Sequence, residues 1–168
     1  MKTLTYFFED SLNLDNILIA INSDNQVVFV SLDNTKEDNI YNLKKEYPNF
    51  KIEEGLLNDN IREIFNHIKN PVRSHSVEIH MDGSDFQINV WKEIMKIPTG
   101  ETASYTEIAK NIGKPESVRA VATACSKNKI AVLVPCHRVV SKSDKNTGYR
   151  WDVFRKKILL DIEKEKEF

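Results

Sequence analysis

Cysteine is scarce in this chain of 168 residues, since only Cys125 and Cys136 occur. So few cysteines, together with the lack of an apolar signal stretch at the polar start of the chain, predict a reducing compartment and no disulfide framework. No apolar run is long enough to cross a membrane as a helix. The four histidines show no zinc-finger spacing relative to the cysteines. We therefore expect no metal ion, no other cofactor and no membrane partner.

The charge is nearly balanced overall, at −1, but the two halves of the chain differ in sign. Residues 1–80 carry 8 Lys and Arg against 13 Asp and Glu, a balance of −5, whereas residues 81–168 carry 16 against 12, a balance of +4. A basic second half is a mild electrostatic sign of nucleic-acid binding, with ordinary variation of surface charge as the alternative. The hydrophobic share of 40% is enough for a globular chain with real cores.

The first half has the pattern of a small α/β domain over residues 1–82. Short β-rich runs, with a turn-forming segment between the last two, predict an antiparallel meander, and apolar residues at helical spacing predict two helices after it. A further strand pattern ends the half, and no chemistry is evident in it. The predicted strands are 4–8, 17–21, 27–32 and 77–81, and the predicted helices are 36–47 and 61–68.

The second half, residues 83–168, has a helical pattern. Ser84 with Gln87 and Ser104 with Glu107 form two capping boxes, which predict helices over about 84–96 and 104–112. A break at residues 113–115 precedes a third predicted helix over 116–126. Helix, glycine-containing turn and helix make a helix-turn-helix unit, although small helical hairpins are also common in proteins that do not bind DNA.

The helix predicted over 116–126 is unusual for a reader of the major groove. Beyond Arg119 it offers mainly small residues, including Ser117 and Thr123. Small residues allow close approach of the backbone to a shallow groove, so minor-groove binding is the better expectation.

Cys136 follows an apolar run, residues 130–134, whose length predicts a buried strand that Pro135 ends. Cys136 should therefore lie on a turn at the edge of a core. His137 could help to ionise the thiol, but neighbouring residues point in different directions, so we expect a bridging water between them. The alternative for an isolated cysteine after an apolar run is a core-filling role.

The second half resembles the methylated-DNA–protein-cysteine methyltransferases, also called O6-alkylguanine-DNA alkyltransferases. The resemblance spans about residues 83–163, and in the first half it is limited to the order of elements, where the family has a ribonuclease-H-like domain. It therefore implies an α/β (α+β) fold class with a mainly helical DNA-binding domain. The matching residues are Phe86-Gln87, Val90-Trp91, Gly100-Glu101, Ser104-Tyr105, Val118-Arg119-Ala120-Val121, Asn128, Pro135-Cys136-His137-Arg138-Val139-Val140, Gly148-Tyr149 and Leu159-Leu160.

The resemblance implies four catalytic roles. Cys136 takes the alkyl group from O6 of guanine in a single displacement and keeps it, so that each molecule acts once. His137 draws the thiol proton through a water, and Glu163 orients the histidine. Asn128 ties the recognition helix to the cysteine turn, whereas without the family a helix C-cap is its simplest explanation. A solvated surface charge is the corresponding alternative for Glu163.

The resemblance also implies how DNA is held. The guanine must leave the duplex, because its O6 is stacked inside. Arg119 fills the space that the flipped nucleotide leaves, with a plain phosphate contact as the alternative, and Tyr105 crowds the 3′ phosphate and hydrogen-bonds the base. The backbone at Cys136 and Val139 accepts the guanine amino group. The pocket wall comes from Tyr149, Arg150 and Trp151. The hydroxyl of a tyrosine and a main-chain NH near Arg150 protonate or hydrogen-bond the departing O6. Ser117 and Thr123 complete the expected DNA-binding residues.

The pocket sequence departs from the commonest family pattern at residues 150–152. Arg150 and Trp151 resemble the C-terminal domain of the bacterial adaptive-response protein, where Asp152 is replaced by glycine. We expect Trp151 to narrow the pocket and favour methyl over bulky groups, and Asp152 to cap a last helix over 153–162.

The expected function is direct reversal of O6-methylguanine, with O4-methylthymine as a second expected substrate, in double-stranded DNA bound through its minor groove. A monomer in a bacterial cytoplasm is the expected setting. The alternatives are a non-catalytic alkylated-DNA-binding module and a regulatory helix-turn-helix protein, both of which Cys136 and the small-residue helix disfavour.

Overall fold

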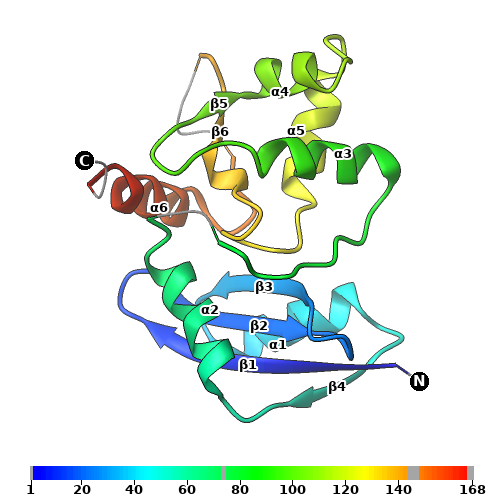
Figure 1. Cartoon of the computed structure of the whole chain (residues 1–168), viewed down its shortest axis with the longest axis vertical. Helices are drawn as coiled ribbons and strands as arrows, with labels where there is room; N and C mark the ends of the chain where they lie inside the picture. Colours follow the sequence, from blue (N-terminus) through cyan, green and yellow to red (C-terminus); the bar gives the residue numbers. More distant parts are fainter. Residues whose placement is uncertain (1, 73–74, 144–147, 166–168) are drawn as a thin grey trace.

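The computed structural model describes residues 2–72, 75–143 and 148–165. Figure 1 shows a sheet with its helices at one end of the molecule and a group of helices at the other. The predicted combination of an α/β first half and a mainly helical second half is confirmed. In the part of the chain that the structure describes, no helix is long and apolar enough to cross a membrane.

The sheet begins with the predicted antiparallel meander of β1 (Thr3–Ser11), β2 (Asp15–Ile21) and β3 (Val27–Asp33). A fourth strand, β4 (Lys51–Glu54), pairs in parallel with β1 and gives the order β3-β2-β1-β4. The sequence analysis did not predict β4, because three of its four residues are charged. It lies at the edge of the sheet, where charged side chains can remain in water.

The two helices of the first half pack on opposite faces of this sheet (Figure 1). They are α1 (Lys36–Glu46), which begins at the N-cap Thr35, and α2 (Asp59–Lys69), which begins at the N-cap Asn58. Both positions agree with the predicted helices. The apolar side of α1 closes a small core with Leu4, Leu18 and Phe29, whereas α2 joins the larger core.

The second half contains α3 (Asp85–Ile94), α4 (Tyr105–Asn111), α5 (Val118–Ser126) and α6 (Val153–Glu165). The capping box of Ser84 and Gln87 is complete. At α4, the Ser104 side chain accepts from the Glu107 backbone, as predicted, and α5 begins two residues later than expected.

The strand predicted over 130–134 is wrong. Only Ile130 forms a bridge, to Val30, and the chain then turns through Val132, whose φ is +67°. Hydrogen bonds within the turn and from a side chain satisfy this backbone in place of a sheet ladder. A short helix, η1 (Cys136–Arg138), and β6 (Val139–Val140) follow, and β6 pairs with β5 (Ala103–Ser104).

The strand predicted over 77–81 is also mostly wrong, since only Ile79 forms a bridge, to Val27. That segment and Ile130 both bridge to the edge of β3 that does not pair with β2, and the larger core contains residues of both halves. The division of the chain into 1–82 and 83–168 stays a prediction.

Candidate active site

Cys136 begins η1 and is only 5% exposed. It borders a cavity of about 490 Å³ that is lined in part by the end of α5. The wall of this cavity comes from α4, α5, the cysteine turn and the segment before α6. Its lining residues are Tyr105, Ala122, Cys125, Ser126, Cys136, Ser141, Gly148, Tyr149 and Arg150.

The side chain of Asn128 holds the cysteine turn. Its Nδ2 donates to the carbonyls of Ile130 at 3.3 Å and Val134 at 3.0 Å, and its Oδ1 accepts from the Ile130 backbone at 2.9 Å. Asn128 is 1% exposed and follows Lys127, the C-cap of α5, so it connects the end of that helix to the segment before Cys136. The geometry explains how a run of apolar residues can turn instead of extending.

His137 and Glu163 form a buried pair, with 2.8 Å between Nε2 and Oε2. Glu163 comes from α6 and is 1% exposed, so it is not one of the solvated charges of the chain's end. Because the carboxylate accepts the proton on Nε2, Nδ1 of the ring carries the lone pair. Among the described residues, this buried Nδ1 has no hydrogen-bond partner. It is therefore available to accept a proton.

The protonation states follow from burial and from neighbouring charges. Burial raises the pKa of the Cys136 thiol well above its usual value, and Cys125 adds to this, while Asn128 and Lys156 oppose it. Burial lowers the pKa of His137 despite its bond to Glu163. For Glu163, burial favours the neutral acid, but hydrogen bonds from His137 and Arg138 outweigh it and lower the pKa to about 2. The resting site thus holds a thiol, a neutral imidazole and a carboxylate.

Two buried cations complete the site. The sequence analysis named Arg138 only as part of the family motif and did not name Lys156, so it gave neither of them a role. Arg138 donates to both oxygens of Glu163 at 2.8 and 2.9 Å, and to the Ile97 carbonyl at 2.8 Å. Lys156 is 1% exposed and donates to the carbonyls of Val139 at 2.8 Å and Gly148 at 3.1 Å. A signal for Lys156 was available, because it precedes Glu163 by seven residues and so shares one face of the last helix.

The expected substrate pocket is assembled in part. Tyr105, Tyr149 and Arg150 line the cavity, whereas Val139 and Trp151 do not. The Trp151 ring is 5% exposed and packs against Tyr149, with 5.4 Å between the ring centres. The lining therefore gives no support to a pocket narrowed directly by Trp151. The cavity adds Cys125, to which the sequence analysis gave no role in the site.

The expected DNA-binding residues lie on the outer face of α5. Arg119 and Thr123 are exposed and Ser117 is half-buried at the start of the helix. All three border an open groove between the N-terminal end of α3 and α5. Tyr105 lies apart from them, at the first turn of α4, where burial raises its pKa to about 12.

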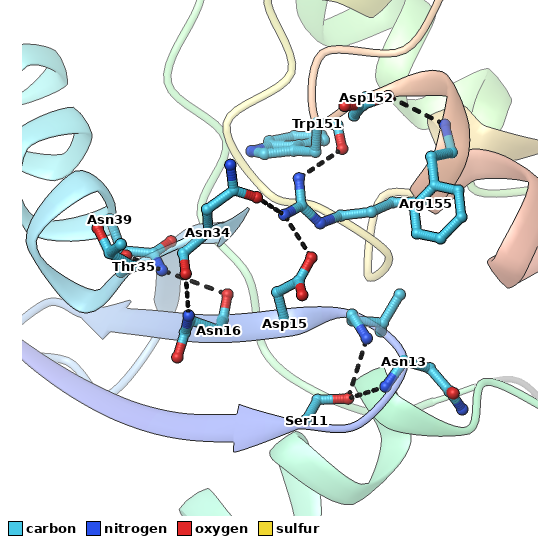
Figure 2. A network of polar contacts seen from close by, with 12 residues as sticks. Ser11, Asn13, Asp15, Asn16, Asn34, Thr35, Asn39, Trp151, Asp152 and Arg155 are labelled. Atoms are coloured by element: carbon cyan, nitrogen blue, oxygen red, sulfur yellow. Dashed lines mark hydrogen bonds and ion pairs between the residues drawn. The ribbon is translucent and has the colours of Figure 1, made fainter.

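The segment before α6 is anchored to the first half of the chain (Figure 2). Arg155 donates to Asp15 and Asn34, each at 2.7 Å, and to the Trp151 carbonyl at 3.1 Å. Asp152 accepts from the Phe154 backbone at 3.1 Å, which agrees with the predicted cap. Its φ of +83° is a conformation that glycine adopts without strain, which agrees with the glycine that the resemblance implies at this position.

Comparison with known proteins identifies the family. Residues 85–165 match the family model "6-O-methylguanine DNA methyltransferase, DNA binding domain". A methylated-DNA–protein-cysteine methyltransferase of Methanosarcina acetivorans is 40% identical over 121 residues, which cover 71% of this chain and 78% of that protein. The crystal structure of Mycobacterium tuberculosis OGT in complex with DNA superimposes with a TM-score of 0.79 at 31% identity, covering 96% of this chain and 94% of that one. The chain belongs to the methylated-DNA–protein-cysteine methyltransferase family.

Some relatives are considerably longer than the matched region. The Escherichia coli bifunctional transcriptional activator/DNA repair enzyme Ada is 42% identical over 112 residues, which cover 67% of this chain but 32% of Ada. The chain thus matches about a third of the length of that protein. Among the described residues, no group of three or more His, Cys, Asp or Glu side chains could hold a metal ion.

Proposed function

We propose that this protein repairs DNA by transferring the methyl group of O6-methylguanine to Cys136, once per molecule. The observation that carries the proposal is a cysteine bordering a cavity next to a buried His137–Glu163 pair. A free Nδ1 on His137 and an anionic Glu163 are what a base for the thiol requires. The family membership supports the same reaction.

The bonds and protons of the proposed step balance with the protein, the methylated base and a water, without a cofactor. The thiol proton passes through a water to Nδ1 of His137, and the Cys136 sulfur attacks the methyl carbon as the bond from carbon to O6 breaks. A thioether remains on the protein, and the proton that the thiol lost replaces the methyl group on the base. Glu163 stabilises the transient imidazolium. Tyr105 and Arg150 line the cavity, which supports the tyrosine hydroxyl and a main-chain NH near Arg150 as donors to the departing oxygen.

The proposed substrate is double-stranded DNA, approached from its minor groove. Cys136 is too deeply buried to reach a base inside the stack, so the guanine must flip into the cavity. The exposed side chains of Arg119 and Thr123, with Ser117, suit α5 to a shallow groove, and Arg119 would occupy the space that the base leaves. O4-methylthymine is a proposed second substrate, and a monomer in a bacterial cytoplasm is the proposed setting.

The intact mass of the protein, measured after mixing with a duplex containing O6-methylguanine, tests this proposal. We expect the mass to increase by one methyl group in the wild type and in Cys125→Ser, and to stay unchanged in Cys136→Ser. A wild-type protein that binds the duplex without a change of mass would be a lesion-binding module, and the proposal would be wrong.

A further inference from the structure

Arg150 joins three parts of the molecule at the cavity wall. One arm of its guanidinium, Nη1, donates to the Asn128 carbonyl at 2.6 Å, and the other, Nη2, pairs with Glu46 Oε1 at 2.5 Å. Glu46 is the last residue of α1, in the first half of the chain. The Arg150 guanidinium also lies 5.4 Å from the centre of the Trp151 ring. A cavity-lining side chain is thus held by a carboxylate from outside the catalytic half.

The ion pair is sheltered enough to constrain Arg150. The side chains of Glu46 and Arg150 are 27% and 22% exposed, so water screens their attraction less than it would on the surface. The same guanidinium donates a hydrogen bond to the main-chain carbonyl of Asn128, whose side chain holds the turn before Cys136. Arg150 therefore touches both the cavity wall and the support of the cysteine turn.

We propose that Glu46 is a positioning residue for methyl transfer, acting through Arg150. This inference depends on the proposed function, since it concerns the same cavity. Without the carboxylate, the guanidinium would be free to turn toward solvent or a DNA phosphate. It would then leave the Asn128 carbonyl and shift the wall against which the flipped base rests. A misplaced base slows the transfer step more than it weakens DNA binding.

The second link between the halves supplies a matched control. Asp15 pairs with Arg155 at 2.7 Å (Figure 2), but neither residue lines the cavity. Asp15 has a φ of +62°, which asparagine tolerates well, so Asp15→Asn removes the charge without strain. Glu46→Gln is the equivalent change at the other link. Both variants weaken the contact between the halves, and only one of them releases Arg150.

Single-turnover transfer from a duplex containing O6-methylguanine, followed by intact mass, separates the two effects. We expect Glu46→Gln to lower the transfer rate at saturating DNA by at least about fivefold, the effect of losing one partly sheltered ion pair. The half-saturating DNA concentration should change by less than about twofold, as expected for an interaction used in the transfer step and not in binding. Asp15→Asn should keep the wild-type rate.

A double-mutant cycle tests whether Glu46 acts through Arg150. In an Arg150→Gln background, Glu46→Gln should slow transfer by less than about twofold, because the side chain it orients is already gone. Equal losses of rate in Glu46→Gln and Asp15→Asn would show that both only loosen the contact between the halves, and would overturn the inference. So would an unchanged rate in Glu46→Gln. A wild type that transfers no methyl group would instead refute the proposed function, and this inference with it.

Discussion

Replacing Asn128 by alanine tests the support of the cysteine turn. The change removes three hydrogen bonds, two to the carbonyls of Ile130 and Val134 and one from the Ile130 backbone. All three residues are buried, so their backbone groups would lose partners without gaining water. At about 1 kcal/mol for each lost bond, the expected loss is about 3 kcal/mol of the free energy of unfolding. Against a typical stability of about 5–15 kcal/mol, the variant should still fold.

Asn128→Ala should also slow methyl transfer by the protein that remains folded. The Cys136 backbone donates to the Val134 carbonyl at 2.8 Å, so a shift of Val134 moves the thiol. A displacement of about 1 Å from the productive geometry can slow a reaction by about a hundredfold. We therefore expect a transfer rate at least about a hundredfold lower, measured as gain of mass over time at a temperature where the variant is folded.

Asn39 offers a control with nearly the same chemistry. It is a fully buried asparagine in α1, and its side chain bonds to Ser31 and to the carbonyls of Asn16 and Thr35. Asn39→Ala should cost a similar free energy of unfolding in urea and leave the transfer rate of the folded protein unchanged. If both variants slow transfer equally, or if Asn128→Ala keeps the wild-type rate, the assignment of Asn128 as the support of the cysteine turn is wrong.

Three further outcomes follow from the site and its flanks. The folded pKa of Glu163 is about 2, below its ordinary value of 4.5, so this carboxylate stabilises the fold above pH 4.5, and about 3 kcal/mol of the free energy of unfolding should be lost as the pH falls from 4.5 to 2. In urea unfolding, Glu163→Gln should lack this pH-dependent component. Parallel curves of stability against pH for the variant and the wild type would contradict the prediction. The raised pKa of the Cys136 thiol should make its alkylation by iodoacetamide at neutral pH slower than that of a free cysteine, as peptide mass would show. Asp152→Ala should lower the unfolding free energy by about 1–2 kcal/mol, since alanine loses the cap and is strained at φ +83°, whereas Asp152→Gly should stay within about 1 kcal/mol of the wild type.

The sequence pattern was sufficient to predict helices, whose backbone hydrogen bonds are internal, and strands that pair with the next strand along the chain. The meander follows from short β-rich runs with a turn-forming segment between the last two, and α2 from apolar residues at helical spacing. The Ser84 capping box located α3 because the side chain and the backbone it caps are three residues apart. These signals are local, so no tertiary information was required.

Residues 130–134 show where local patterning failed. An apolar run predicts burial correctly, and all five residues are buried, but it does not determine the backbone path. The bonds that turn this segment come from the side chain of Asn128, and Val132 adopts a conformation that valine rarely shows. A long-range constraint of this kind overrides the strand propensity of valine.

Some site residues could likewise be predicted from local sequence, whereas others depend on contacts between distant parts of the chain. Cys136 and His137 were candidates on chemical grounds, and Glu163 only through the spacing of a family motif. Arg138 and Lys156 were given no role because a cation in a sequence is assumed to be solvated, and their burial becomes visible only when α6 packs beside η1. Glu46 could not be found at all, since 104 residues separate it from Arg150.

The charges around Cys136 explain how a buried thiol can serve as a nucleophile. Burial alone opposes the thiolate. Proton transfer to His137 would create a thiolate and an imidazolium together, so the total charge of the site would not change. Arg138 and Lys156 are two cations against the single carboxylate of Glu163, which leaves an excess positive charge that favours the thiolate. Glu163 in turn stabilises the imidazolium that Arg138 disfavours. In the proposed reaction the base is therefore neutral at rest and becomes charged only as the sulfur attacks.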